Sequence, residues 1–166
     1  MKIVYVIRHA KSSWADSKLP DFERPLNERG KSDAPAMAKR LLAKNMKIDA
    51  FLTSPAQRAK KTCALFCEEF GIQEEKMIVI ESLYLAPPKA FFEVVNDLDN
   101  KYNNVAIFAH NPGVTDFVNM LSKDVHIDEM PTCSIFAFEI NTEDWKGFKN
   151  TEKKFLFFDY PKQSNS

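Results

Sequence analysis

The sequence begins with an apolar run that no polar residue interrupts. Residues 3–7 read Ile-Val-Tyr-Val-Ile and are all β-branched or aromatic. A half-buried strand would alternate apolar and polar residues, so this run predicts a short strand that is buried on both faces. Strands of this kind occur in parallel sheets that have helices above and below. Arg8-His9 follows the run directly, at the edge where such sheets bind ligands.

The rest of the chain alternates strands with helices. Further apolar segments predict strands, and segments with an apolar stripe or a capping residue predict helices. The predicted strands cover residues 3–7, 48–53, 76–81, 104–109, 134–140 and 153–158. The predicted helices cover residues 34–44, 56–70, 89–100 and 114–121. This order predicts a three-layer α/β/α sandwich with a mainly parallel central sheet and an antiparallel edge made by the last two strands.

Prolines, glycines and short polar residues set the expected boundaries. Ser32-Asp33 should cap the helix over residues 34–44, and Ser54-Pro55 should start the next helix. Gly71 should end that second helix. Residues 11–29 are polar and contain two prolines, which predicts a long loop between the first strand and the first helix.

The composition limits the class of protein. We expect one domain over residues 1–161 and a polar, mobile tail over residues 162–166. Basic and acidic residues both number 23, so no nucleic acid and no membrane is expected as a partner. The N-terminus lacks a signal-peptide pattern, and the three cysteines lie in apolar surroundings. These features predict core thiols and a cytoplasmic protein, which we expect to be a monomer.

Polar side chains gather where three of the predicted strands end. The first strand gives Arg8-His9, the second gives a segment that ends in Arg58, and the fourth gives His110-Asn111-Pro112-Gly113. These ends share one edge of a parallel sheet, so the two histidines should meet the two arginines there. Because an arginine fork can hold a phosphate by two hydrogen bonds, the cluster predicts a phosphate site. His126 lies between acidic residues and should be solvated.

Four short motifs resemble those of the histidine phosphatase superfamily, in that family's order. Arg8-His9-Ala10 is similar to its Arg-His-Gly signature, and residues 53–59 to its Ser-Pro-x-x-Arg-Ala element. Residues 109–113 are similar to its Gly-His-x-Pro element. Residues 24–30, Arg-Pro-Leu-x-x-x-Gly, resemble a segment of its small SixA-like branch of phosphohistidine phosphatases. The resemblance implies a phosphoglycerate mutase-like fold and a phosphatase that needs no metal and no cofactor.

The resemblance also implies roles for individual residues. His9 would be the nucleophile, and Arg8, Arg58 and His110 would bind the phosphoryl oxygens. Arg24 and Trp14 would lie near the mouth of the site, with Arg24 as a substrate-binding residue. The attacking nitrogen of His9 must be unprotonated, so the other ring nitrogen should donate to a fixed acceptor, and the arginines should disfavour the charged ring. Ala10 replaces the family's glycine, so its backbone should need no positive φ.

The general acid is missing from the matched motifs. Larger members of the family use an acidic residue after the third strand, where this chain has only Glu81, so Glu81, Asp16 and Asp21 all stay open for this role. An imidazole leaves phosphorus more easily than an alkoxide does, so a site without an acid favours phosphohistidine on a protein as substrate. The alternatives are a small-molecule phosphomonoesterase or mutase of the same family and a non-catalytic phosphate-binding module.

Overall fold

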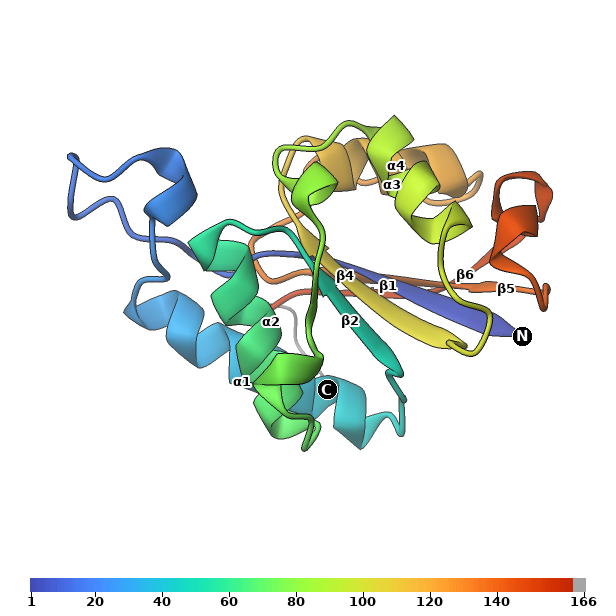
Figure 1. Cartoon of the computed structure of the whole chain (residues 1–166), viewed down its shortest axis with the longest axis horizontal. Helices are drawn as coiled ribbons and strands as arrows, with labels where there is room; N and C mark the ends of the chain where they lie inside the picture. Colours follow the sequence, from blue (N-terminus) through green and yellow to red (C-terminus); the bar gives the residue numbers. More distant parts are fainter. Residues whose placement is uncertain (163–166) are drawn as a thin grey trace.

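A six-stranded sheet forms the centre of the molecule in the computed structural model, which describes residues 1–162 (Figure 1). The strand order is β3-β2-β4-β1-β5-β6. The strands are β1 (Lys2–Arg8), β2 (Ala50–Thr53), β3 (Ile78–Val79), β4 (Asn104–Ala109), β5 (Ile135–Ile140) and β6 (Lys153–Asp159). β1 to β4 run parallel, whereas β5 pairs antiparallel with both β1 and β6. The predicted tail lies outside the described residues except for Lys162.

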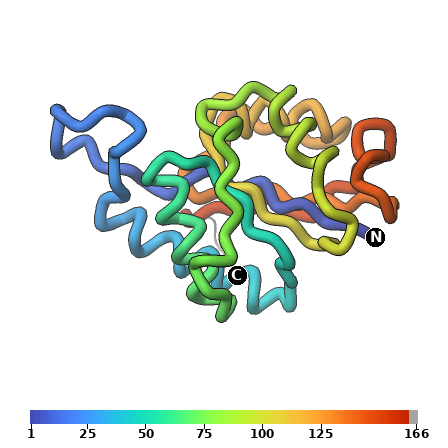
Figure 2. The backbone as a smooth tube through the Cα atoms, in the orientation of Figure 1, coloured from blue at the N-terminus to red at the C-terminus, as the bar shows by residue number. Residues whose placement is uncertain are grey.

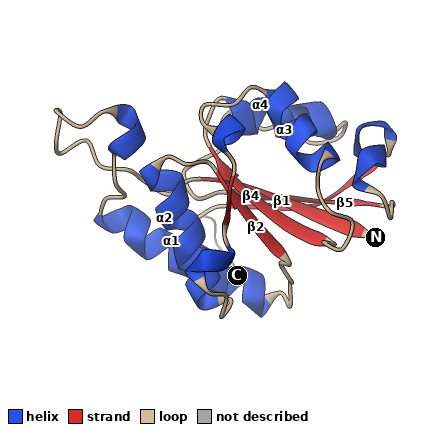
Figure 3. Cartoon of the chain, viewed as in Figure 1, coloured by secondary structure: helices blue, strands red, loops and turns tan. Residues whose placement is uncertain are grey.

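Two pairs of helices cover the two faces of the sheet. α1 (Glu28–Ala43) and α2 (Gln57–Glu69) lie on one face, and α3 (Pro88–Asn96) and α4 (Gly113–Leu121) lie on the other (Figure 3). β1 contributes alternately to both interiors: Val4 and Val6 pack toward α3 and α4, and Tyr5 and Ile7 toward α1 and α2. All four side chains are fully buried, and burying one such side chain stabilises a fold by about 1.5–3 kcal/mol. The predicted α/β sandwich is confirmed.

The start of α1 was predicted wrongly. The helix begins at Glu28 because the side chain of Asn27 caps it, accepting from the backbone N–H of Gly30 at 2.8 Å. Ser32-Asp33 therefore does not cap the helix, and both residues lie inside it together with Pro35. Gly30 is required by a close approach, because a Cβ there would collide with the carbonyl oxygen of Lys11.

Other boundaries also differ from the predictions. α2 begins two residues after Pro55 and has no side-chain cap, so the hydroxyl of Ser54 is free for another contact. It ends before Gly71, which has a φ of 71°, as predicted. β3 pairs with β2 alone at one edge of the sheet and is only two residues long, shorter than the strand predicted over residues 76–81. Within the described part of the chain, no helix is long and apolar enough to cross a bilayer.

The segment between β1 and α1 projects from one end of the molecule (Figure 2). An isolated antiparallel β-bridge joins Ser12 to Leu26, so the two ends of the segment lie side by side. A short 3-10 helix, η1 (Asp21–Glu23), packs against α2. This segment therefore stands at the carboxyl ends of the parallel strands, where the predicted site residues are.

Candidate active site

The ends of β1, β2 and β4 bring the predicted site residues together. His9 follows β1, and His110 follows the neighbouring strand β4, where Arg8 pairs with Ala109. The ring centroids of His9 and His110 are 5.2 Å apart. Arg58 lies in the first turn of α2, and its charge and that of Arg8 both act on the two rings. His9, Arg58 and His110 are 6%, 3% and 2% exposed, so the cluster is almost closed to solvent.

The ring of His9 is neutral and has a fixed orientation. Its Nδ1 lies 2.7 Å from the carbonyl oxygen of Ala10, and a carbonyl can only accept, so the proton lies on Nδ1 and Nε2 is free. Burial lowers the pKa of His9 to about 3, with smaller contributions from His110, Arg58 and Arg8. Burial was not part of the sequence argument, which named only the arginines. The backbone of Ala10 has no positive φ, as predicted.

His110 is held by the hydroxyl of Ser54. Its Nε2 lies 2.7 Å from Ser54 Oγ, and the same oxygen accepts from the backbone N–H of Ala56 at 3.2 Å. The hydroxyl proton is then free to point at Nε2, which places the proton of a neutral His110 on Nδ1. Burial and the charge of Arg58 lower the pKa of His110 to about 3, so the ring is neutral at ordinary pH.

Three buried nitrogen atoms in the cluster lack a hydrogen-bond partner. They are Nε of Arg8, Nε of Arg58 and Nδ1 of His110, one from each strand end. Only two further buried side-chain atoms in residues 1–162 share this condition, Tyr5 Oη and Asp33 Oδ2. A buried polar atom without a partner costs about 1–3 kcal/mol, so three such donors in one cluster indicate a site that binds a ligand with several acceptor oxygens.

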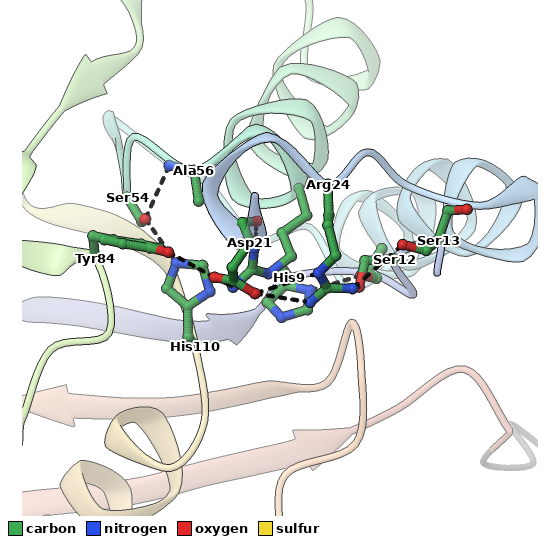
Figure 4. A network of polar contacts seen from close by, with 11 residues as sticks. His9, Ser12, Ser13, Asp21, Arg24, Ser54, Ala56, Tyr84 and His110 are labelled. Atoms are coloured by element: carbon green, nitrogen blue, oxygen red, sulfur yellow. Dashed lines mark hydrogen bonds and ion pairs between the residues drawn. The ribbon is translucent and has the colours of Figure 1, made fainter. Parts of the chain in front are cut away.

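Asp21 joins the cluster from the projecting segment. Its carboxylate accepts from Arg58 Nη2 at 2.9 Å and from the hydroxyl of Tyr84 at 2.6 Å, and its backbone oxygen accepts from Arg58 Nη1 at 2.7 Å (Figure 4). Burial tends to raise the pKa of Asp21, but the hydrogen bonds from Tyr84 and Arg58 outweigh it and lower the pKa to about 2. The sequence left the role of Asp21 open, because its partners are 37 and 63 residues away along the chain.

Arg24 lies at the side of the cluster, and its guanidinium contacts several neighbours. It donates to Ser12 Oγ at 2.7 Å, pairs with the carboxylate of Asp21 at 3.3 Å and stacks on the ring of Trp14 at 3.6 Å. Trp14 is 73% exposed, so this stacked pair borders the solvent. The positive charge of Arg24 also contributes to the lowered pKa of His110, so Arg24 acts electrostatically on the site.

Other candidate residues lie elsewhere. Glu81 and Asp16 are exposed. His126 is exposed, as predicted, and its Nε2 lies 3.5 Å from Oδ1 of Asp128. The cysteines are buried free thiols, as predicted; they are Cys63, Cys67 and Cys133. No group of three His, Cys, Asp or Glu side chains in residues 1–162 is arranged to hold a metal ion.

The model of the histidine phosphatase superfamily (branch 1) matches residues 4–83 of this chain. An uncharacterized chloroplastic protein of Arabidopsis thaliana is 30% identical over 125 residues, which cover 70% of this chain and 57% of that protein. An uncharacterized protein of Mycobacterium tuberculosis is 33% identical over 106 residues, covering 64% of this chain and 63% of the other. The chain therefore spans about three fifths of the length of these curated relatives.

Solved structures share the fold over nearly the whole chain. The protein histidine phosphatase SixA complexed with tungstate has a TM-score of 0.80 at 22% identity, covering 96% of this chain and 97% of the other. A mycobacterial glucosyl-3-phosphoglycerate phosphatase has a TM-score of 0.73 at 13% identity, covering 96% and 100%. At such identities the likeness establishes the fold alone.

Proposed function

This chain belongs to the histidine phosphatase superfamily, and on that premise we propose that it is a phosphatase that works through a phosphohistidine intermediate on His9. One observation carries the proposal. The neutral ring of His9, with Nε2 unprotonated, lies in a buried cluster that holds three unpaired N–H donors. A nucleophile beside donors that have no protein acceptor is the arrangement that phosphoryl transfer requires.

In the first step, Nε2 of His9 attacks the phosphorus atom of the substrate. The Nε2–P bond forms, and the bond from phosphorus to the leaving group breaks. Arg8, Arg58 and His110 donate to the phosphoryl oxygens, whose negative charge is spread in the transition state. The guanidinium groups supply the positive charge that a metal ion provides in other phosphatases, so the mechanism needs none.

In the second step, water attacks the phosphorus atom of phospho-His9. The new O–P bond forms, the P–Nε2 bond breaks, and the electron pair returns to Nε2. Phosphate leaves with the oxygen of the water, one proton is released, and His9 regains its starting form. The proton stays on Nδ1 and keeps its hydrogen bond to the carbonyl oxygen of Ala10 in both steps, so the ring keeps one orientation.

Phosphohistidine on a protein is the substrate that we propose. Neither Asp21 nor Glu81 is suited to protonate an alkoxide, since Asp21 has a pKa of about 2 and is ionised, and Glu81 is exposed on η3 (Glu81–Leu83). A protonated imidazole leaves without such help, whereas an alkoxide gains about 10²–10⁴-fold from a general acid. The fold shared with SixA also supports this choice.

A small-molecule phosphomonoesterase or mutase is the second candidate. It is favoured by a 2,3-bisphosphoglycerate-dependent phosphoglycerate mutase of Methylobacterium, which is 34% identical over 88 residues. The two candidates share the same intermediate and differ in the leaving group. Turnover of a phosphohistidine peptide and of 3-phosphoglycerate, measured side by side, distinguishes them.

Trapping the intermediate tests the mechanism common to both. The protein is mixed with ³²P-labelled phosphoimidazole and quenched in alkali, where phosphohistidine survives. We expect an acid-labile label on the peptide that contains His9, none in His9→Ala, and full labelling in the matched variant His126→Ala. Label on another residue, or hydrolysis that persists in His9→Ala, would refute the mechanism and indicate another nucleophile. Absence of both label and hydrolysis in the wild-type protein would leave a phosphate-binding role.

A further inference from the structure

The carboxylate of Asp21 acts on the buried ring of His110 and is itself partly open to solvent. Its side chain is 45% exposed, whereas His9 and His110 are 6% and 2% exposed. Tyr84 donates its hydroxyl to Asp21 and packs its ring edge-on against His110, with centroids 5.6 Å apart. Figure 4 shows the carboxylate between Tyr84 and Arg24. The carboxylate is thus a partly exposed negative charge that contacts both Arg58 and Tyr84 beside the two imidazoles.

The charges around the two histidines are nearly balanced once a phosphoryl dianion is bound. Three guanidinium groups and one carboxylate, Asp21, act on the rings. Asp21 and a phosphoryl dianion together offset the three guanidinium groups. Glu129, which acts on Arg8, adds negative charge from the other side. A leaving group with its own carboxylate would therefore bring unbalanced negative charge beside Asp21, whereas an imidazolium would bring attraction.

We propose that Asp21 determines the specificity of the site by disfavouring substrates whose leaving group is negatively charged. It thereby favours neutral or cationic leaving groups, of which the protonated imidazole of phosphohistidine is one. This inference rests on the proposed function and assigns a role to a residue outside the nucleophile and its phosphate ligands. For two charges at a partly exposed site, the discrimination should be about tenfold.

Two phosphate esters of nearly equal size isolate the effect of charge. Glycerol 3-phosphate and 3-phosphoglycerate differ at the far end, which is a hydroxymethyl group in one and a carboxylate in the other. Their dissociation constants are measured by displacement of vanadate in isothermal titration calorimetry, so that turnover is not required. We expect the wild-type protein to bind glycerol 3-phosphate more tightly, and Asp21→Asn to narrow the ratio of the two constants about tenfold.

Matched variants separate charge from structure. Asp21→Glu keeps the charge and should keep the wild-type ratio. Glu23→Gln removes the same charge from an exposed position on η1, and it should also keep the ratio. Loosening of Arg58 in Asp21→Asn would weaken both ligands equally and cancel in the ratio.

The proposal is overturned if the ratio of the dissociation constants of 3-phosphoglycerate and glycerol 3-phosphate is the same in Asp21→Asn as in the wild-type protein. It is also overturned if Glu23→Gln narrows the ratio as much, because the effect would then come from net charge alone. Labelling of His9 by phosphoimidazole in Asp21→Asn is the separate readout for the proposed function. If His9 is labelled in Asp21→Asn and the ratio of the two dissociation constants is unchanged, only the role of Asp21 is refuted. If His9 is not labelled in the wild-type protein, the phosphatase mechanism is refuted.

Discussion

Replacing Ser54 with alanine tests whether a hydroxyl group sets the proton position on His110. The change leaves two buried groups without a partner, Nε2 of His110 and the backbone N–H of Ala56, which now lie 2.7 and 3.2 Å from the oxygen. At about 1–3 kcal/mol for each of the two groups, the free energy of unfolding should fall by about 2–6 kcal/mol. A domain in the middle of the usual range of about 5–15 kcal/mol stays folded after such a loss.

The same change should also lower the rate. Without the hydroxyl, the proton of His110 is free to move to Nε2, and Nδ1 then presents a lone pair to the phosphoryl oxygens. We expect kcat to fall about 10- to 100-fold, less than the roughly 10²–10³-fold lost when a transition-state donor is removed outright. Urea unfolding followed by circular dichroism gives the stability, and release of phosphate from phosphoimidazole gives kcat and KM.

Ser134 provides the matched control for this experiment. Its hydroxyl also belongs to a buried serine, but it donates to the carbonyl oxygen of Pro131 at 2.6 Å and not to a site histidine. Ser134→Ala should lose about 1 kcal/mol of stability and keep kcat. If Ser54→Ala keeps kcat as well while losing stability, the hydroxyl serves the fold alone and the argument about the tautomer of His110 is wrong.

Two further predictions follow from the titration of the site and from one close backbone approach. Because burial lowers the pKa of His9 and His110 from 6.5 to about 3, the unfolded chain binds more protons between these values, so the free energy of unfolding should decline as pH falls from about 6.5 to 3. Urea titrations at several pH values check this, and a flat profile above pH 4 would contradict it. Gly30→Ala should cost about 1–3 kcal/mol, because the new Cβ meets the carbonyl oxygen of Lys11, whereas Gly147→Ala meets ordinary side-chain contacts and should cost less; equal melting temperatures would refute the clash.

The sequence predicts β1 and β4 well because these central strands are buried on both faces. β4 has the predicted bounds, and β1 extends only one residue beyond the predicted run at each end. The meeting of His9, His110 and Arg58 also follows from the sequence, because parallel strands end at one edge whatever their spacing along the chain. Local pattern and topology are enough for these features.

Contacts between distant segments are what the sequence leaves open. The start of α1 depends on which polar residue caps it, and Asn27 takes that role because Gly30 lets the helix approach Lys11 closely. Asp21 lies in a polar segment with no periodic pattern, and nothing local distinguishes its carboxylate from that of Asp16. Its position is fixed by Arg58 and Tyr84, which a pattern of neighbouring residues does not connect to it.

The paired ends of the projecting segment have a consequence for how such a protein diversifies. The backbone N–H of Ser13 donates to the carbonyl oxygen of Pro25, and that of Asn27 donates to the carbonyl oxygen of Lys11. These two hydrogen bonds hold the ends of the segment together at its base. Residues between positions 13 and 25 can therefore be inserted, deleted or exchanged without changing the distance between the two ends of the segment. Selection can thus change what reaches the mouth of the site while the reacting imidazole keeps its place. A chimaera that carries a foreign segment between residues 13 and 25 should fold with His9 in the same position, although it loses the contacts of Asp21 with Arg58.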